Sequence, residues 1–186
     1  MSFIVGIDGP AGTGKGTITN LVAKDLKLNQ IDTGAMYRAF TLYMLDNKVE
    51  LDEIEKIKEL LEKVKIDLIQ EDDKETVFLN GKDVTKEIRS KSVTNFVSPV
   101  SSIIEVRIKM VELQRKMAEG KNVIMEGRDI TTYVFPNANV KIYLDANVEE
   151  RAKRRYKENI EKGMQTTFEE VLQDMKKRDY NDMHKP

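Results

Sequence analysis

The chain has 186 residues, 40% of them hydrophobic, which is enough apolar surface for one packed domain of ordinary size. Its 31 basic and 32 acidic side chains nearly balance, which argues against a nucleic-acid partner, and the absence of cysteine together with a single histidine excludes disulfides and histidine- or thiolate-based zinc sites. No apolar run approaches the ~18 residues of a membrane-spanning helix and no leader-like segment precedes the first apolar run, so we expect no membrane partner and a cytoplasmic location.

The first predicted elements follow the order strand, loop, helix. The apolar run 3–7 is rich in β-branched residues and leads through a glycine-rich loop into a helical pattern that extends to about residue 27. A second short strand is expected at 29–31, after which Thr33 can cap a helix that extends to about residue 46. The pattern also predicts a helix at 51–63.

The periodicity changes after this third helix. Alternating apolar residues predict a strand at 64–69, the composition of 71–74 is typical of a turn, and 76–79 predicts a second strand. Asn80-Gly81 is a strong signal for a type I′ hairpin that leads into 82–84. These segments predict a small antiparallel insertion.

The rest of the chain returns to alternating helices and strands. Ser98-Pro99 combines a capping residue with a proline, which predicts the start of a helix that continues to a glycine stop at Gly120. The runs 123–125 and 140–144 are mainly apolar and do not alternate, which predicts buried strands. Two helices with capping boxes are expected to follow, at 148–162 (Asn147 with Glu150) and at 168–180 (Thr167 with Glu170).

This order predicts an α/β fold, in which a mostly parallel sheet is covered on both faces in three α/β/α layers and is interrupted by one small α+β insertion. Only four strands of the main sheet are predicted, whereas a sheet of this kind usually has at least one more. We therefore expect at least one further strand that this chain lacks.

The glycine-rich loop fits the pattern G-x-x-x-x-G-K of a phosphate-binding loop, with glycine after the lysine where Ser or Thr is usual. Glycines let consecutive N–H groups point at an anion, the following helix adds the positive end of its dipole, and Lys15 adds a mobile charge for the β- and γ-phosphates. An ordinary glycine-rich turn is the alternative, but strand, spacing, lysine and helix coincide here. The candidate ATP-binding residues are Gly9, Pro10, Ala11, Gly12, Thr13, Gly14, Lys15, Gly16 and Thr17.

The form G-x-x-G-x-G-K-G-T resembles the loop of nucleoside monophosphate kinases, and later segments narrow the resemblance to bacterial cytidylate kinases. These segments are D-T-G-A-M-Y-R at 32–38, L-N-G-K-D-V at 79–84, E-G-R-D at 126–129, V-F-P at 134–136 and R-D at 178–179. The resemblance spans nearly the whole chain. It implies a P-loop NTPase fold and phosphorylation of CMP and dCMP by ATP with Mg²⁺, in pyrimidine nucleotide metabolism, by a monomer.

The resemblance also implies a division of the chain. The P-loop kinase core would comprise 1–36 and 106–186, with a helical lid at about 151–167, and 37–105 would be the acceptor-binding insertion. A final strand and helix would follow Pro186, and arginine would stand at the position of Lys185.

Transfer between two nucleotides brings several negative charges together, so such an enzyme needs cations, and the planar guanidinium of arginine suits phosphate oxygens. By resemblance, Arg38, Arg128 and Arg178 hold the acceptor phosphate or the transferred group. The catalytic residues would be Lys15, Arg128 and Arg178. The acceptor oxygen would attack the γ-phosphorus in line, without a covalent intermediate.

The resemblance assigns recognition of the cytosine ring to Ser98, Arg107 and Asp129. It assigns the sugar hydroxyls to Asp182, and Thr33 is a further candidate for acceptor binding. Each assignment has a structural alternative. Ser98 can cap a helix, Arg107 can lie on a solvent-facing side, Asp129 can pair with the neighbouring arginine, and Asp182 can form an ion pair within a helix.

Three arginines near the start of the helix at 148–162 are candidate lid cations that close over ATP and exclude water: Arg151, Arg154 and Arg155. An ion pair between Glu150 and Arg154 is the alternative. No side chain is expected to bind Mg²⁺ directly, although Thr17 and Glu126 are placed to orient it through water.

Two other functions remain open at this stage. The chain could be a nucleotide-binding module that does not turn over, or a kinase for another small acceptor, such as shikimate or a different nucleotide. The phosphate-binding loop alone does not distinguish them.

Overall fold

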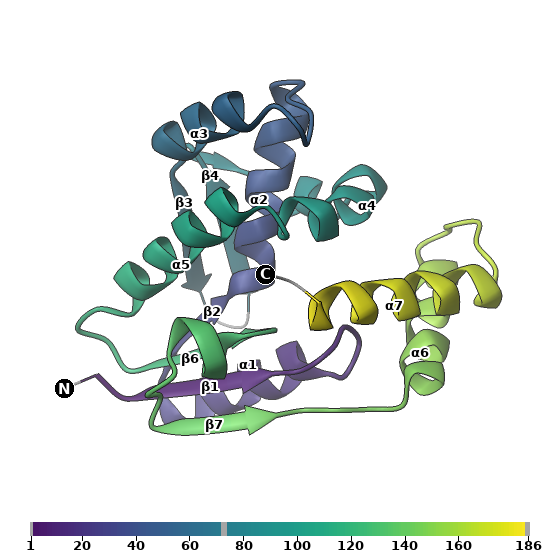
Figure 1. Cartoon of the computed structure of the whole chain (residues 1–186). Coiled ribbons are helices and arrows are strands. Elements are labelled where there is room, and N and C mark those ends of the chain that lie inside the picture. Colours follow the sequence, from purple (N-terminus) through teal and green to yellow (C-terminus); the bar gives the residue numbers. More distant parts are fainter. Residues whose placement is uncertain (1, 72–73, 185–186) are drawn as a thin grey trace.

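The computed structural model describes residues 2–71 and 74–184 of the chain. The central sheet has four strands. In Figure 1 an insertion of helices and a second sheet lies above the central sheet, and the helices α6 and α7 lie to one side. No helix in the described residues is long and apolar enough to cross a membrane. The elements are β1 (Ile4–Asp8), α1 (Lys15–Leu26), β2 (Asn29–Asp32), α2 (Thr33–Asp46), α3 (Ile54–Lys63), β3 (Ile66–Glu71), β4 (Lys74–Leu79), β5 (Lys82–Asp83), η1 (Glu87–Arg89), α4 (Lys91–Val100), α5 (Ile104–Ala118), β6 (Val123–Gly127), η2 (Ile130–Val134), β7 (Val140–Tyr143), α6 (Val148–Glu161) and α7 (Phe168–Met183).

The central sheet has the strand order β2-β6-β1-β7, and all of its strands are parallel. Its buried side chains alternate between two faces. Val5, Ile7 and Ile124 form one hydrophobic cluster with α1, whereas Ile31 and Met125 belong to another cluster with α2 and α5. This arrangement confirms the predicted three layers. Because the strands are parallel, their carboxyl ends meet at one edge of the sheet, which is where open α/β sheets bind ligands.

The insertion carries a second, antiparallel sheet of order β3-β4-β5. Asn80 and Gly81 have φ angles of 50° and 83°, which confirms the type I′ hairpin. The turn predicted at 71–74 includes residues 72 and 73, which lie outside the described residues. Buried insertion residues such as Val77 and Ile88 join the hydrophobic cluster of the main sheet, so the insertion packs directly on the core. Its predicted boundaries fall inside α2 and α5, and the division of the chain stays a prediction.

The helix start predicted at Ser98-Pro99 is wrong. α4 already begins at Lys91 after the cap residue Ser90, and it ends at Val100, one residue beyond Pro99. Proline in the last turn removes one backbone donor where the helix is about to stop, which limits its cost. A short break then separates α4 from α5, so the single helix expected up to Gly120 is two helices.

The caps of the last two helices differ from each other. Thr167 and Glu170 form the predicted capping box at the start of α7. At the start of α6, the Asn147 side chain accepts the N–H of Glu149 instead, and the box predicted with Glu150 is wrong.

The strand predicted at 140–144 forms as β7, but it is not buried. All four of its residues are exposed, Ile142 by 42% and Tyr143 by 64%. Within the described residues β7 pairs only with β1 and is therefore an edge strand. A mainly apolar run predicts burial on both faces, and only the arrangement of neighbouring elements decides whether that burial occurs.

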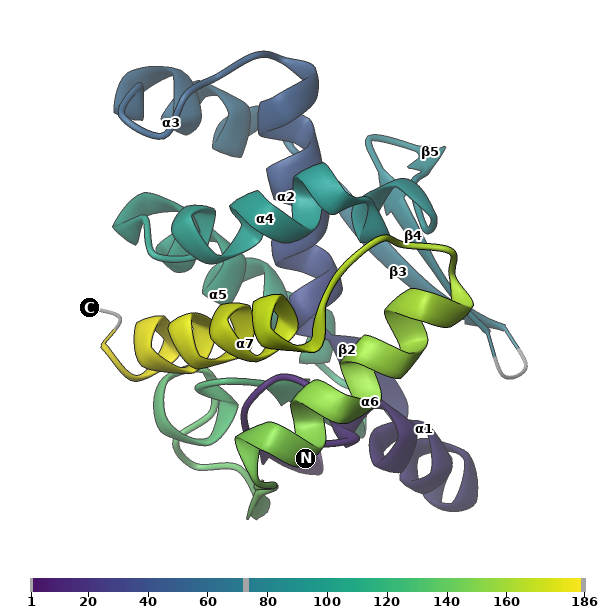
Figure 2. The same cartoon turned by 90° about the vertical axis from the view of Figure 1, so that its right-hand side faces the viewer.

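Helices α6 and α7 pack against each other beside the sheet, with α7 running close to α4 (Figure 2). Their interface is a small hydrophobic cluster of Ala152, Val171 and Met175. Ala11 of the glycine-rich loop packs against this cluster, so the two helices border the loop.

Candidate active site

The glycine-rich loop joins β1 to α1 at the carboxyl edge of the central sheet. Gly9 has a φ of 148°, and a Cβ there would lie 2.0 Å from the carbonyl oxygen of Leu144, so only glycine fits. α1 begins after Gly14, which offers no side-chain cap. The first N–H groups of the helix have no intrahelical partner, and together with the helix dipole they provide a site for an anion.

Lys15 curls back over this loop. Its Nζ donates hydrogen bonds to the carbonyl oxygens of Gly9 at 2.6 Å and Pro10 at 2.7 Å. Burial lowers the pKa of Lys15 to about 8, and the positive charge of Arg128 adds to that effect while Glu126 opposes it. A phosphate group placed in the loop would supply the negative charge that this ammonium lacks.

Glu126, at the end of β6, lies beside the start of α1. A Cβ at Gly16 would lie 3.3 Å from its Oε1, so glycine leaves room for the carboxylate at the position where such loops usually carry Ser or Thr. Burial and the negative charge of Asp32 raise the pKa of Glu126 to about 7, and Lys15 counteracts the rise. The carboxylates of Glu126 and Asp32 therefore both act on the charge of Lys15.

Thr33 connects the second strand–helix junction to Glu126. Its hydroxyl donates a hydrogen bond to the carbonyl oxygen of Glu126 at 2.7 Å. It is not the cap of α2, because the carboxylate of Asp32 accepts the N–H of Ala35 at 3.0 Å and fills that role. Asp32 comes one residue earlier in the chain, where the backbone is still extended as an N-cap requires. The contact of Thr33 with an acceptor stays a prediction.

Arg38 on α2 and Arg178 on α7 meet at Thr94 on α4. Arg38 donates to the Thr94 hydroxyl at 2.9 Å, and Arg178 donates to the Thr94 carbonyl. Burial and the positive charges of Arg178, Arg89 and Arg155 lower the pKa of Arg38 to about 10. Burial and neighbouring arginines lower the pKa of Arg178 as well. Cations held this close to one another disfavour their own charge, and a polyanion would relieve that repulsion.

Arg128 extends this group of cations toward the loop. Its Nε donates to Asp182 on α7 at 2.8 Å, and its charge contributes to the lowered pKa of both Lys15 and Arg178. Arg128 therefore lies within electrostatic range of the other two predicted catalytic residues, although the three come from distant parts of the chain.

Two of the three residues expected to recognise cytosine are in contact. Arg107 on α5 donates to the carboxylate of Asp129 at 2.8 Å and stacks over the ring of Tyr133 at 5.2 Å. Burial and the charge of Asp129 raise the pKa of the Tyr37 hydroxyl. Ser98, the third residue, contacts α7: its hydroxyl accepts a hydrogen bond from Asn181 at 3.5 Å.

Arg151 differs from the other lid candidates because it is buried. Its guanidinium donates to both carboxylate oxygens of Asp179, at 2.6 and 3.2 Å, and to the carbonyl oxygens of Ala146 and Ala11. It thereby ties α6 and α7 to the loop. Arg155 is partly exposed, with Glu158 at 3.4 Å, and its charge acts on Arg38 and Arg178.

Several residues around these clusters had no role assigned from the sequence, and five of them illustrate why. Two of them lie inside the segments that carry the resemblance and could have been found there, namely Tyr37 and Asp179. The other three have no motif around them, because their positions depend on the packing of the insertion and α7: Arg89, Thr94 and Asn181.

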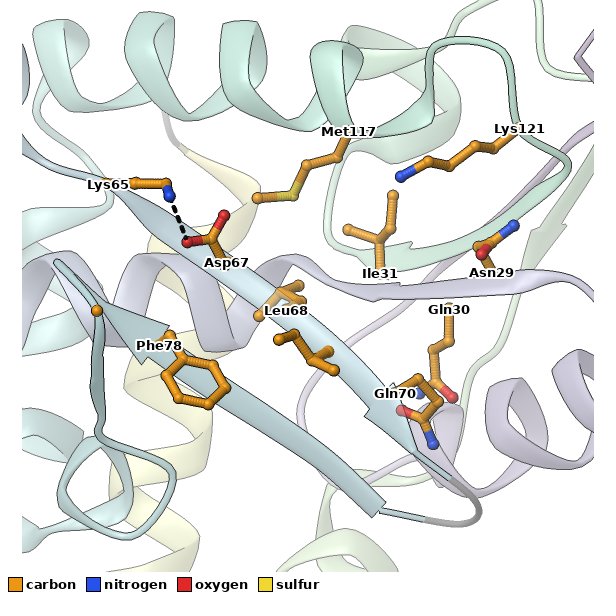
Figure 3. Close-up of a pocket in the computed structure, with 12 residues that line it drawn as sticks. Asn29, Gln30, Ile31, Lys65, Asp67, Leu68, Gln70, Phe78, Met117 and Lys121 are labelled. Atoms are coloured by element: carbon orange, nitrogen blue, oxygen red, sulfur yellow. Dashed lines mark ion pairs between the residues drawn. The ribbon is translucent and has the colours of Figure 1, made fainter.

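A separate pocket of about 530 Å³ lies on another part of the molecule, between β2, the insertion sheet and the end of α5 (Figure 3). Its lining includes the ion pair of Lys65 with Asp67 at 3.4 Å, the ring of Phe78 and the side chain of Lys121. None of the predicted site residues lines it. Its size alone therefore does not make it the active site.

The fold and the cations around the loop define the chain as a P-loop kinase. A family model described as cytidylate kinase matches residues 5–186, and the chain belongs to the cytidylate kinase family. The cytidylate kinase of Fusobacterium nucleatum is 50% identical over 97% of this chain and 81% of its own length. Those of Caldicellulosiruptor saccharolyticus and Bacillus subtilis are 49% and 46% identical, over 96% and 94% of this chain and 79% and 78% of their own lengths.

Proposed function

We propose that the chain, as a member of this family, transfers the γ-phosphoryl group of ATP to CMP and dCMP by direct in-line attack. The observation that carries the mechanism is the convergence of Lys15, Arg38, Arg128 and Arg178 at the carboxyl edge of the sheet, with lowered pKa values for three of them. These are the cations that a transition state between two phosphates requires.

On the donor side, the backbone N–H groups of the loop from Gly9 to Thr17 would hold the ATP phosphates. Lys15 would exchange the carbonyl oxygens it now contacts for β- and γ-phosphate oxygens. Arg155 would reach ATP from the lid after leaving the weak surface pair with Glu158. Arg151, the other proposed ATP ligand, would first have to leave Asp179.

On the acceptor side, we assign the CMP phosphate to Arg38, Arg128 and Arg178. Arg107 and Asp129 would read the cytosine ring, because together they offer both donors and an acceptor to a base edge that carries an amino group and a carbonyl. Ser98 would complete this recognition. Asp182 would bind the sugar hydroxyls, and Thr33 would line the same acceptor site.

The residues near the loop suit Mg²⁺ that is bound through phosphates and water. No group of three acidic or histidine side chains in the described residues could enclose a metal ion, but Gly16 leaves space beside the Glu126 carboxylate at the start of α1. Mg²⁺ commonly binds through phosphates and water with one or two protein oxygens. We propose that Thr17 and Glu126 orient its water, and that the bound ion would neutralise phosphate charge.

The remaining parts of the proposal concern organisation. The core (1–36 and 106–186) would bind ATP, the insertion (37–105) would bind the acceptor, and the lid at about 151–167 would exclude water during transfer. We propose that the chain acts as a monomer in the cytoplasm, in pyrimidine nucleotide metabolism.

The test is an ADP-release assay with CMP, dCMP, UMP, AMP and shikimate offered separately. The proposal expects acceptor-dependent ADP with CMP and dCMP at rates at least tenfold above the others. ADP formed with another acceptor but with neither cytidine nucleotide would contradict the assigned substrate. Nucleotide binding without turnover of any acceptor would make the chain a binding module.

A further inference from the structure

Asp8, the last residue of β1, has a buried carboxylate, and both of its oxygens accept hydrogen bonds. Only 2% of the residue is exposed. One carboxylate oxygen accepts the N–H of Ile130 at 2.7 Å. The other accepts the N–H of Thr131 at 2.8 Å and the Thr131 hydroxyl at 2.7 Å. Three hydrogen bonds therefore join residues that are more than 120 positions apart in the chain.

These bonds connect the two halves of the proposed site. Gly9, the first residue of the phosphate-binding loop, follows Asp8 directly. On the other side, Arg128 and Asp129 immediately precede the first residue that Asp8 holds, Ile130. The side chain of Asp8 thus links the donor loop to the segment that carries an acceptor-phosphate residue and a base-reading residue.

Strand pairing alone does not require this carboxylate. β1 and β6 are aligned by their backbones, with Asp8 opposite Gly127. Beyond Gly127 the chain leaves the sheet, and the direction it takes is no longer fixed by the ladder. A buried carboxylate is costly unless hydrogen bonds compensate it, and the N–H groups of Ile130 and Thr131 at the start of η2 provide that compensation.

We propose that Asp8 is a positioning residue for phosphoryl transfer, which sets the place of Arg128 and Asp129 relative to the ATP-binding loop. The inference rests on the proposed function of that site. Asp8 itself contacts neither nucleotide in this role. Its effect on the reaction comes through geometry, because displacement of a substrate-positioning group by about 1 Å can cost on the order of 100-fold in rate.

The test compares Asp8→Asn with two other variants. In Asp8→Asn, an NH₂ group replaces one oxygen and meets N–H donors, so at least one of the three bonds is lost. Thr131→Val removes only the hydroxyl bond and provides a milder variant that keeps both backbone contacts. Asn139→Ala is the matched control, since the Asn139 side chain also anchors β1, by accepting the N–H of Ile4 at 2.8 Å at the opposite end of the strand.

Steady-state constants for CMP and ATP and the melting temperature should be measured for all three variants. Asp8→Asn should raise the KM for CMP and lower kcat by at least tenfold each, with the KM for ATP within twofold of wild type. Thr131→Val should change the KM for CMP and kcat by about threefold, again with little change in the KM for ATP. This variant tests the proposal even if Asp8→Asn does not fold. Asn139→Ala should leave kcat and the KM values for CMP and ATP unchanged at temperatures below its melting transition.

Two outcomes would overturn the positioning role. One is a lower melting temperature in Asp8→Asn with unchanged constants for CMP. The other is a KM for ATP that rises as much as the KM for CMP, in Asp8→Asn or in Thr131→Val. If the wild type phosphorylates no cytidine nucleotide, the proposed function fails independently of the role of Asp8. The positioning role is then tested by calorimetry, in which Asp8→Asn should raise the dissociation constant for CMP and leave that for ATP unchanged.

Discussion

Arg107 and Asp129 form an ion pair of 2.8 Å whose arginine side chain is only 10% exposed. They lie 22 positions apart, one on α5 and one after β6, and the ring of Tyr133 covers the guanidinium. Such a pair has fixed donors and acceptors, which suits recognition of a flat polar base edge.

Replacement of Asp129 by alanine should therefore affect CMP far more than ATP. We expect the KM for CMP to rise at least tenfold, because the variant loses an acceptor and leaves Arg107 without its carboxylate, while the KM for ATP changes by less than twofold. Steady-state kinetics with each substrate varied would check this. Equal losses for both nucleotides would contradict the base-reading role.

Lys15 should impose a pH limit on the use of ATP. Its pKa is lowered to about 8 by burial and by Arg128, so the free enzyme loses this positive charge as the pH rises through about 8. We expect kcat/KM for ATP to fall above that pH, since this ratio reports ionisations of the free enzyme. Lys15→Ala should abolish transfer at every pH. A profile that stays flat from pH 7 to 10 would contradict this assignment.

Arg151 should contribute to stability in addition to its proposed role as an ATP ligand. Removal of one partner from a buried pair leaves an uncompensated charge, which costs about 3–5 kcal/mol. Arg151→Ala should therefore lower the melting temperature by roughly 10 °C in a domain of this size. The control is Lys157→Ala, because Lys157 is 80% exposed and lies 3.9 Å from Glu161. If Arg151→Ala weakens ATP binding but leaves the melting temperature unchanged, Arg151 acts only as a lid cation.

Glu75 should make the fold less stable as the pH rises. Burial and the charge of Asp32 raise its pKa to about 8, and one of its carboxylate oxygens has no hydrogen-bond partner within the described residues. Because the folded state binds the proton more tightly than the unfolded state, the stabilisation is complete below the unfolded pKa, near 4.5, and is lost as the pH rises through about 8.

Urea denaturation at pH 5.5, 7 and 8.5 would measure this dependence. Glu75→Gln should reduce the decline in the free energy of unfolding, although Glu126, whose pKa is raised to about 7, will keep part of it. Glu62→Gln, at an exposed position on α3, is the control. An identical pH dependence in wild type and Glu75→Gln would show that Glu75 does not contribute.

The elements with strong local signals could be predicted from the sequence. The G-x-x-x-x-G-K loop, the Asn80-Gly81 hairpin and the Thr167 capping box each depend on residues close together in the chain, and each formed as expected. The helix break near Pro99 was missed because the Ser-Pro pair that is typical of a helix start also occurs in the last turn of a helix.

The sequence by itself determined the layered α/β fold, the phosphate-binding loop and the family to which the chain belongs, because periodicity and short motifs are local properties. The tertiary structure alone decided which distant side chains meet. Thr94 joins Arg38 to Arg178, Asp8 holds the segment after Arg128 and Asp129, and Asp179 neutralises Arg151. Burial of apolar surface fixes these contacts across the whole chain, and no pattern of neighbouring residues records them.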